Sequence, residues 1–230
     1  MSEEEIEEIY GKRYFEGKRY SNYASYKDEK IIVMRKKYFP KILQDITLSK
    51  GMRVLDIGCA YGYFLKLCDE VGCETYGIDI SKYAINHAKK ETKAKLFLHD
   101  VNKGLPMFTN DFFDLVTMFD VIEHLTSPFL TLKELHRVLK PGGWLVITTP
   151  NLNSIERYLK KLFGKEKEWH GYYDKTHLYL FTPVSLNFLV ERSGFKIVKT
   201  ETPFHPLPEF IQKIVNKTSL GGQIWLVGKK

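Results

Sequence analysis

Short apolar runs alternate with helical patterns along most of the chain. Seven runs have the length of a buried strand and lie between turn residues. Between them, apolar positions recur three and four residues apart, which is the period of an amphipathic helix. Strands that alternate with helices favour an α/β fold built around a mostly parallel sheet. The predicted strands cover residues 52–57, 74–79, 95–99, 113–119, 143–149, 195–201 and 222–228.

Three of the predicted helices begin with capping signals. Ser81 directly follows the second strand and predicts a helix that runs to about residue 91. Ser127-Pro128 joins an N-cap residue to a proline at the first helical position, and Thr182-Pro183 repeats this pattern. Lys140-Pro141-Gly142-Gly143 and Ser193-Gly194 predict the ends of these two helices.

Three segments lie outside this alternation. In an open α/β sheet the ligand binds beyond the carboxyl ends of the strands, and insertions after strands project to that edge. We therefore expect residues 150–182 and 203–220 to cap the substrate. Residues 1–29 are expected to fold over as a lid, although their tyrosines could instead simply pack on the sheet. These tyrosines are Tyr10, Tyr14, Tyr20, Tyr23 and Tyr26.

Length and composition favour a single globular domain over residues 1–230, with 43% hydrophobic and 27% charged residues. No apolar run is long enough to span a bilayer, so we expect no membrane insertion. The N-terminus is acidic and lacks the apolar core of a signal peptide, which predicts a cytoplasmic protein. The three cysteines have no Cys-x-x-Cys spacing, which argues against a disulfide framework and a zinc knuckle.

The net charge of +7 permits acidic partners but does not require them. The lysines are spread along the predicted helices, as they are on an ordinary solvated surface. No signature of an RNA-binding module is present in the sequence. Nucleic acid is therefore a less favoured partner than a small molecule.

Residues 54–62 carry most of the chemical information. Val54-Leu55-Asp56-Ile57 reads as a buried strand with an acid near its end, and Gly58-Cys59-Ala60-Tyr61-Gly62 is a loop rich in small residues. A helix-like run follows from Tyr63. This arrangement lets a nucleotide-like ligand approach bare backbone at a helix N-terminus. About twenty residues on, Tyr76-Gly77-Ile78-Asp79 is a second strand that ends in an acid, placed to accept hydrogen bonds from ribose hydroxyls.

This pattern resembles the class I S-adenosylmethionine-dependent methyltransferases. Their Asp-x-Gly-x-x-x-Gly motif matches Asp56, Gly58 and Gly62, and the usual middle glycine is Ala60 here. In NAD-type loops, by contrast, the acid comes only at the end of the second strand. The resemblance implies S-adenosylmethionine as cofactor and a doubly wound seven-stranded sheet whose last strand is antiparallel to the rest. Residues 222–228 would be that strand.

The resemblance also implies which residues contact the cofactor. Asp79 would hold the ribose hydroxyls, and Asp100, which ends the third strand, would accept the adenine amino group. Asp100 could instead be a turn residue that only caps the next segment. The predicted cofactor contacts are Asp56, Gly58, Cys59, Ala60, Gly62, Asp79, Ile80, Asp100, Val101 and Phe119.

Three further phrases are typical of a branch that resembles ubiquinone-biosynthesis O-methyltransferases. They are Ile122-Glu123-His124-Leu125, Thr149-Pro150-Asn151 and the run from Thr176 to Pro183. The branch implies methyl transfer to a small molecule, at oxygen. A histidine with a pKa near neutrality can remove the acceptor's proton. We therefore name His124 and His177 as candidate catalytic residues, each with a purely structural role as its alternative.

A metal site is a further possibility that we leave open, and we assign no metal ligand from the sequence. Asp120, Glu123 and His124, with His177, resemble the Glu-x-x-Glu-His metal motif of small-RNA 3′-end methyltransferases and some ubiquinone-pathway enzymes. A Mg²⁺-type ion there would chelate adjacent hydroxyls and lower the pKa of the nucleophile.

Two other functions stay open at this stage. An RNA methyltransferase fits the net charge and the metal-motif resemblance. A non-catalytic cofactor-binding protein, or a subunit that activates a partner, fits the loop alone. The sequence identifies neither the methyl acceptor nor the oligomeric state.

Overall fold

The computed structural model describes residues 2–17, 25–26, 28, 38–203 and 218–230. Tyr20 and Tyr23 of the predicted lid, and most of the predicted cap 203–220, lie outside the described residues. The chain groups into two compact units. Unit 1 comprises Met1–Leu105 with Phe112–Thr117, and unit 2 comprises Pro106–Asp111 with Met118–Lys230.

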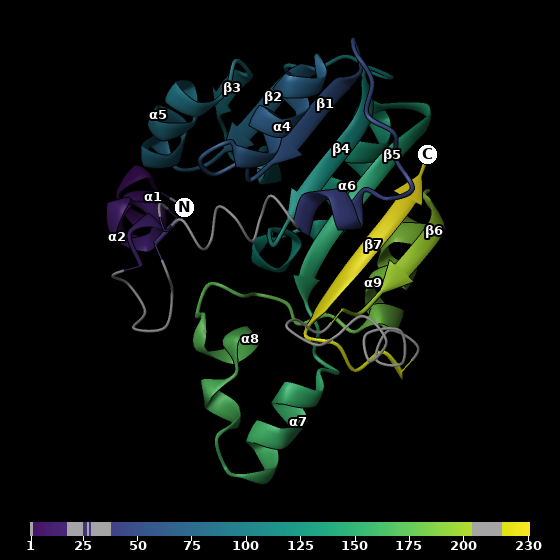
Figure 1. The fold of residues 1–230 in the computed structure, drawn as a ribbon. Coiled ribbons are helices and arrows are strands. Elements are labelled where there is room, and N and C mark those ends of the chain that lie inside the picture. The colour runs from purple at the N-terminus through teal and green to yellow at the C-terminus, as the bar shows by residue number, and fades with distance from the viewer. Residues whose placement is uncertain (1, 18–24, 27, 29–37, 204–217) are drawn as a thin grey trace. The chain divides into compact units, whose positions relative to one another are not determined.

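The predicted seven-stranded sheet is confirmed (Figure 1), with strand order β3-β2-β1-β4-β5-β7-β6. β1 pairs in parallel with β2, and β2 with β3. β7 pairs antiparallel with both β5 and β6, as expected for the last strand. The strands are β1 (Arg53–Ile57), β2 (Glu74–Asp79), β3 (Lys95–Leu98), β4 (Phe113–Phe119), β5 (Leu139–Pro150), β6 (Lys196–Glu201) and β7 (Gln223–Lys229).

In unit 1, one helix connects β1 to β2 and another connects β2 to β3. All but the first residue of β1 and of β2 are buried, as expected for parallel strands that are covered on both faces. The hydroxyl of Ser81 accepts a hydrogen bond from the Ala84 N–H, so the predicted cap of α5 is confirmed. The described helices of unit 1 include α1 (Glu3–Tyr10), α2 (Lys12–Phe15), α4 (Tyr63–Val71), α5 (Lys82–Glu91) and the 3₁₀ turn η1 (Val101–Lys103), and residues 38–42 are also helical.

Unit 2 contains the remaining elements. Thr182 and Ser185 form a capping box at the start of α9, as the sequence predicts. Ser127 differs, because its side chain makes no capping hydrogen bond although α6 does begin at Pro128. The elements are η2 (Ile122–His124), α6 (Pro128–Val138), α7 (Ile155–Leu162), η3 (Glu166–Glu168), α8 (His170–Tyr173) and α9 (Pro183–Arg192).

β5 begins at Leu139, four residues earlier than the sequence suggests. The Gly142 N–H donates to the Lys230 carbonyl, and the Lys230 N–H donates to the Gly143 carbonyl. Pairing with the chain end therefore extends the strand through glycines that look like a helix stop in the sequence.

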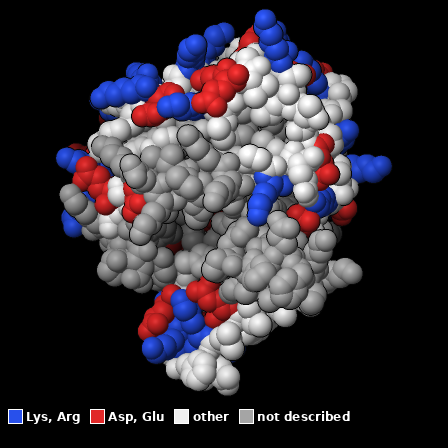
Figure 2. Space-filling view, viewed as in Figure 1, with Lys and Arg blue, Asp and Glu red and all other residues white. Residues whose placement is uncertain are grey.

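No helix in the described residues is long and apolar enough to cross a bilayer. On the described part of the face in Figure 2, basic and acidic side chains lie beside one another. This is the arrangement of an ordinary solvated surface.

Candidate active site

The loop between β1 and α4 has an unusual backbone. Gly58, Ala60 and Gly62 all have positive φ values, of 69°, 48° and 75°. Glycine adopts this region freely, whereas alanine does so at a cost of about 1–2 kcal/mol. A Cβ on Gly62 would also lie 2.8 Å from the Thr92 Cγ2 atom. The small residues of this loop are therefore required by its shape.

Asp79 ends β2 and fastens this loop. Its Oδ2 accepts a hydrogen bond of 2.8 Å from the Ala60 N–H, and its Oδ1 accepts one of 2.8 Å from the Ser81 N–H. Burial raises the pKa of Asp79 to about 6, and the backbone donors of Ser81, Ala60 and Ile80 oppose that shift. At neutral pH the site therefore holds an ionised, pre-positioned hydrogen-bond acceptor.

Asp56 lies one strand away and is also buried. Its Oδ1 accepts a hydrogen bond of 2.7 Å from the Thr117 hydroxyl, which ties β1 to the part of β4 that belongs to unit 1. The neighbouring Cys59 thiol is buried, and burial with the charge of Asp79 raises its pKa well above the ordinary value. Cys59 therefore fills space in the loop and is not a reactive thiolate.

Asp100 caps η1, which is the capping role that the sequence left open for it. Its Oδ1 accepts hydrogen bonds from the N–H and the side-chain amide of Asn102. Val101 is buried and Ile80 half-buried. Their contacts with a cofactor, and that of Asp100 with adenine, stay predictions.

Glu123 is the most unusual acid of unit 2. It lies in η2 directly after β4, and it is only 1% exposed. Its Oε2 accepts a hydrogen bond of 3.0 Å from the Thr149 hydroxyl, whereas Oε1 has no hydrogen-bond partner within the described part of the chain. Burial, with the nearby charges of Asp120 and Asp174, raises the pKa of Glu123 well above its ordinary value.

His124 and His177 lie beside this carboxyl group. Their ring centroids are 4.8 Å apart, and one ligand atom from each histidine and from Glu123 all lie within 4.8 Å of one another. His124 Nδ1 lies 3.1 Å from the Thr176 carbonyl, and His177 Nδ1 lies 3.0 Å from the Gly171 carbonyl. A carbonyl only accepts, so these contacts favour a proton on Nδ1 of both rings, the tautomer in which Nε2 can bind a metal ion.

Burial and the proximity of His177 lower the pKa of His124 to about 4. His124 is therefore neutral at physiological pH. That state suits a metal ligand better than a general base, because a base works best with a pKa near the working pH.

The sequence missed the residues that hold this cluster together. The Leu178 and Tyr179 N–H groups donate to the Glu123 carbonyl, which brings the two sequence phrases into contact. Asp174 Oδ1 accepts hydrogen bonds from the N–H and hydroxyl of Thr176. An Asp two residues before a Thr is the signal of such a turn, and it was available in the sequence.

Asp120 and Phe119 do not belong to the group of candidate ligands formed by Glu123, His124 and His177. The Asp120 carboxylate accepts hydrogen bonds from the Thr148 hydroxyl and from the Gln223 amide. The backbone at Asp120 has a positive φ of 54°. Phe119 ends β4 and is half-buried, and its predicted cofactor contact stays a prediction.

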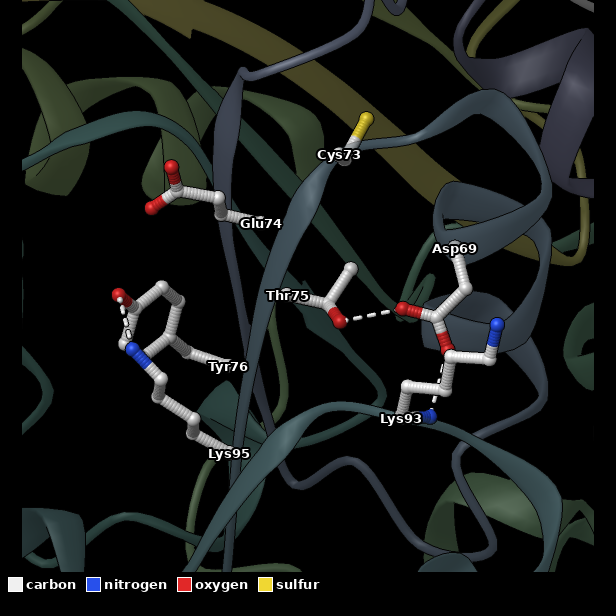
Figure 3. A pocket seen from close by; sticks show the side chains of 7 residues that line it. All are labelled: Asp69, Cys73, Glu74, Thr75, Tyr76, Lys93 and Lys95. Carbon is white, nitrogen blue, oxygen red and sulfur yellow. Dashed lines mark hydrogen bonds between the residues drawn. The ribbon is translucent and has the colours of Figure 1, made fainter.

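A cavity of about 210 Å³ opens at the amino end of β2 (Figure 3), which is the opposite end of the strand from Asp79. There the Asp69 carboxylate accepts hydrogen bonds from the hydroxyls of Thr75 and Thr92 and from the Lys93 N–H. Its oxygens thus already bind donors from the chain itself. We interpret this cavity as structural.

Known proteins resemble this chain over most of its length. The model of a family described as a methyltransferase domain matches residues 24–200. A ubiquinone biosynthesis O-methyltransferase from Coxiella burnetii is 31% identical over 172 residues, covering 72% of this chain and 73% of the relative. One from Burkholderia thailandensis is 27% identical, covering 68% and 70%.

Solved structures share the fold. A SAM-dependent methyltransferase from Archaeoglobus fulgidus superposes with a TM-score of 0.66 at 24% identity, over 98% of this chain and 97% of that one. The sequence relatives therefore indicate the same class of enzyme as the glycine-rich loop and the acid at the end of β2. The chain belongs to the methyltransferase domain family and is an S-adenosylmethionine-dependent methyltransferase.

Proposed function

We propose that this enzyme transfers the methyl group of S-adenosylmethionine to a hydroxyl oxygen of a small molecule, and that it uses a divalent cation held by Glu123, His124 and His177. The observation that carries this proposal is the buried Oε1 atom of Glu123, which has no partner within the described residues and lies beside two imidazoles. The names of the sequence relatives support oxygen as the acceptor atom.

The donor set fits a cation. A buried carboxylate oxygen without a hydrogen-bond partner is costly, and a nearby positive charge removes that cost. Glu123 Oε1, His124 Nε2 and His177 Nε2 would hold the ion. Each Nδ1–H lies against a backbone carbonyl, a contact that fixes the tautomer and orientation of a ligating histidine. When bound, the ion supplies positive charge that lowers the pKa of an acceptor hydroxyl.

The residues around the cluster would position the metal ligands and, through the ion, the acceptor. Thr149 orients the Glu123 carboxyl group, and Asp174 fixes Thr176, whose carbonyl holds the His124 ring. Positioning of this kind supplies much of the rate of a methyl transfer, which requires an aligned acceptor close to the methyl carbon.

In unit 1, the cofactor would be held by the loop 58–62 and by Asp79. The ionised Asp79 would accept hydrogen bonds from the ribose hydroxyls, and the bare backbone of the loop would admit the methionine end. The acid–ribose bond is charge-assisted and contributes roughly 1.5–3 kcal/mol.

An assay of methyl transfer tests the proposal. Protein is treated with chelator, and S-adenosylmethionine labelled in its methyl group is added with 3,4-dihydroxybenzoate, a simple compound with adjacent hydroxyls. We expect label in the acceptor only after a divalent cation is restored. Glu123→Gln should abolish this response, whereas Asp120→Asn should keep it because Asp120 binds Thr148 and Gln223 instead.

The alternative functions give different results in the same assay. Label in added RNA, with binding that weakens steeply as salt rises, would favour an RNA methyltransferase. A protein that binds the cofactor but labels neither the compound nor a metabolite extract would favour a cofactor-binding or partner-activating role. Transfer that is unaffected by chelator would overturn the metal part of the proposal.

A further inference from the structure

Residues 2–17 of the N-terminal segment contact both loops that we assign to the cofactor. α1 has no buried residue, and α2 buries only Phe15, which is 3% exposed. Phe15 is therefore the one buried hydrophobic side chain among residues 2–17. The contacts of the segment with the rest of unit 1 fall into two groups.

The first group of contacts is with the loop between β1 and α4. The Phe15 ring stacks on the Tyr61 ring, with centroids 5.2 Å apart and planes 21° from parallel. Tyr61 is 1% exposed and lies between Ala60 and Gly62, whose positive φ values give the loop its shape. Phe15, Tyr61 and Ala84 form one buried cluster. The Tyr61 ring is therefore held between Phe15 and the His87 ring, whose centroid lies 4.5 Å away, so Phe15 is one of the side chains that fix its position.

The second group of contacts is with the loop after β2. The Ser81 hydroxyl donates a hydrogen bond of 2.6 Å to the Tyr10 carbonyl, and the Ser81 N–H donates to the Asp79 carboxylate. The Tyr83 hydroxyl lies 3.4 Å from Glu16 Oε1 and donates to it. Ser81 therefore links the C-terminal end of α1 to Asp79, the acid that we assign to the ribose, through two hydrogen bonds.

We infer that the N-terminal segment belongs to the cofactor site, where Phe15 and Tyr10 position the two cofactor loops. The segment docks more firmly when the cofactor is bound. This inference rests on the proposed placement of the cofactor at Asp79 and the loop 58–62. Segments with few buried contacts open at little cost. A ligand that needs both loops ordered therefore stabilises the docked segment, and the docked segment strengthens ligand binding by the same factor.

Two measurements on the full chain test the inference. The first is hydrogen exchange of residues 2–17 with and without S-adenosylhomocysteine, the product form of the cofactor. We expect exchange in the segment to slow when the compound binds. The second is calorimetric titration of the compound into wild type, Phe15→Ala and Phe39→Ala. Phe39 is similarly buried at 6% but packs against Phe64 instead of Tyr61, so it controls for the loss of a buried ring.

We expect Phe15→Ala to weaken binding by about 5- to 100-fold and Phe39→Ala to bind like wild type. In the transfer assay, Phe15→Ala should raise KM for S-adenosylmethionine while kcat at saturation stays close to wild type. If Phe15→Ala does not fold, Phe15→Leu keeps an apolar side chain at the site without the ring stacking, and it should show the same effect to a smaller extent.

The outcomes separate this inference from the proposed function. If wild type binds S-adenosylhomocysteine but exchange in residues 2–17 is unchanged, or if the Phe15 variant that folds binds as tightly as wild type, the inference is wrong and the proposed function stands. If wild type does not bind the compound, the cofactor assignment is wrong and the inference fails with it.

Discussion

Asp79 and Glu123 are two buried acids that differ in their hydrogen-bond partners. Each lies at or just beyond the end of a strand, Asp79 in unit 1 and Glu123 in unit 2. Burial raises the pKa of both. Both oxygens of Asp79 accept backbone N–H groups, whereas one oxygen of Glu123 has no partner within the described residues.

The difference shows how burial alone can prepare two kinds of site. The backbone donors stabilise the Asp79 anion enough for it to be ionised near neutral pH, so it can accept hydrogen bonds from a neutral ligand. Glu123 Oε1 has no donor within the described residues, and burial raises the pKa of Glu123 well above its ordinary value, which favours its neutral form in the absence of a cation. In our proposal, Asp79 accepts hydrogen bonds from the ribose hydroxyls, and Glu123 binds a metal ion with two histidines as co-ligands.

The largest effect should come from breaking the Glu123 side of the comparison. His124→Ala removes a group that we place at the acceptor, as metal ligand or base, and should lower the rate of transfer by about 10²–10⁴-fold. S-adenosylhomocysteine affinity should stay close to wild type. A variant with wild-type turnover would show that neither role is correct and that positioning supplies the rate.

Asp79→Ala breaks the other side. It removes a charge-assisted acceptor worth roughly 1.5–3 kcal/mol, so S-adenosylmethionine affinity should fall by about tenfold or more. Calorimetry on the folded variant measures this loss. Divalent-cation binding should be unchanged in the same variant. An unaltered affinity for the cofactor would mean that Asp79 does not hold the ribose.

The pH dependence of cofactor affinity sharpens the assignment of Asp79. Its pKa in the folded protein is raised to about 6, so the ionised acceptor is present above that pH and is lost as pH falls through it. S-adenosylhomocysteine affinity should therefore be flat above about pH 7 and should fall by up to about tenfold per pH unit well below pH 6. The matched control is Asp79→Asn, whose weaker binding should not change in this range. Parallel pH profiles for the two proteins would assign the titration to another group.

The smallest effect concerns Ala60 in the strained loop. Ala60→Gly relieves a left-handed backbone that costs alanine about 1–2 kcal/mol, but it adds about 0.4–1 kcal/mol of chain entropy to the unfolded state. The two effects oppose each other, so the free energy of unfolding should rise by no more than about 1.6 kcal/mol. Urea denaturation measures the change. A large loss of stability would show that the methyl group of Ala60 has a packing role.

The fold was predictable because its signals are local. Buried parallel strands read as short apolar runs, and Ser81 and Thr182 cap their helices as their neighbours in sequence suggest. The prediction failed at β5, where pairing with Lys230 extends the strand through Gly142 and Gly143. A partner about ninety residues away in the chain leaves no local signal.

The site was predictable in its residues but not in its interactions. The sequence named Glu123, His124 and His177 together, and the structure brings them together. It grouped Asp120 with them, but the side chain of Asp120 accepts hydrogen bonds from Thr148 of β5 and Gln223 of β7, which are distant from it in sequence. Asp174 lies two residues before Thr176, which is a local turn signal in the sequence, but the contact of Thr176 with His124 becomes visible only in the folded cluster.

Titration of Mn²⁺ into chelator-treated protein tests the central claim most directly, because manganese accepts both carboxylate and imidazole ligands. Calorimetry in two buffers of different ionisation enthalpy measures the protons released on binding. We predict stoichiometric binding with proton release by wild type, because Glu123 must ionise to bind. Binding should be lost in Glu123→Gln and kept in Asp120→Asn. Absence of binding by wild type, or equal binding by Glu123→Gln, would contradict the account.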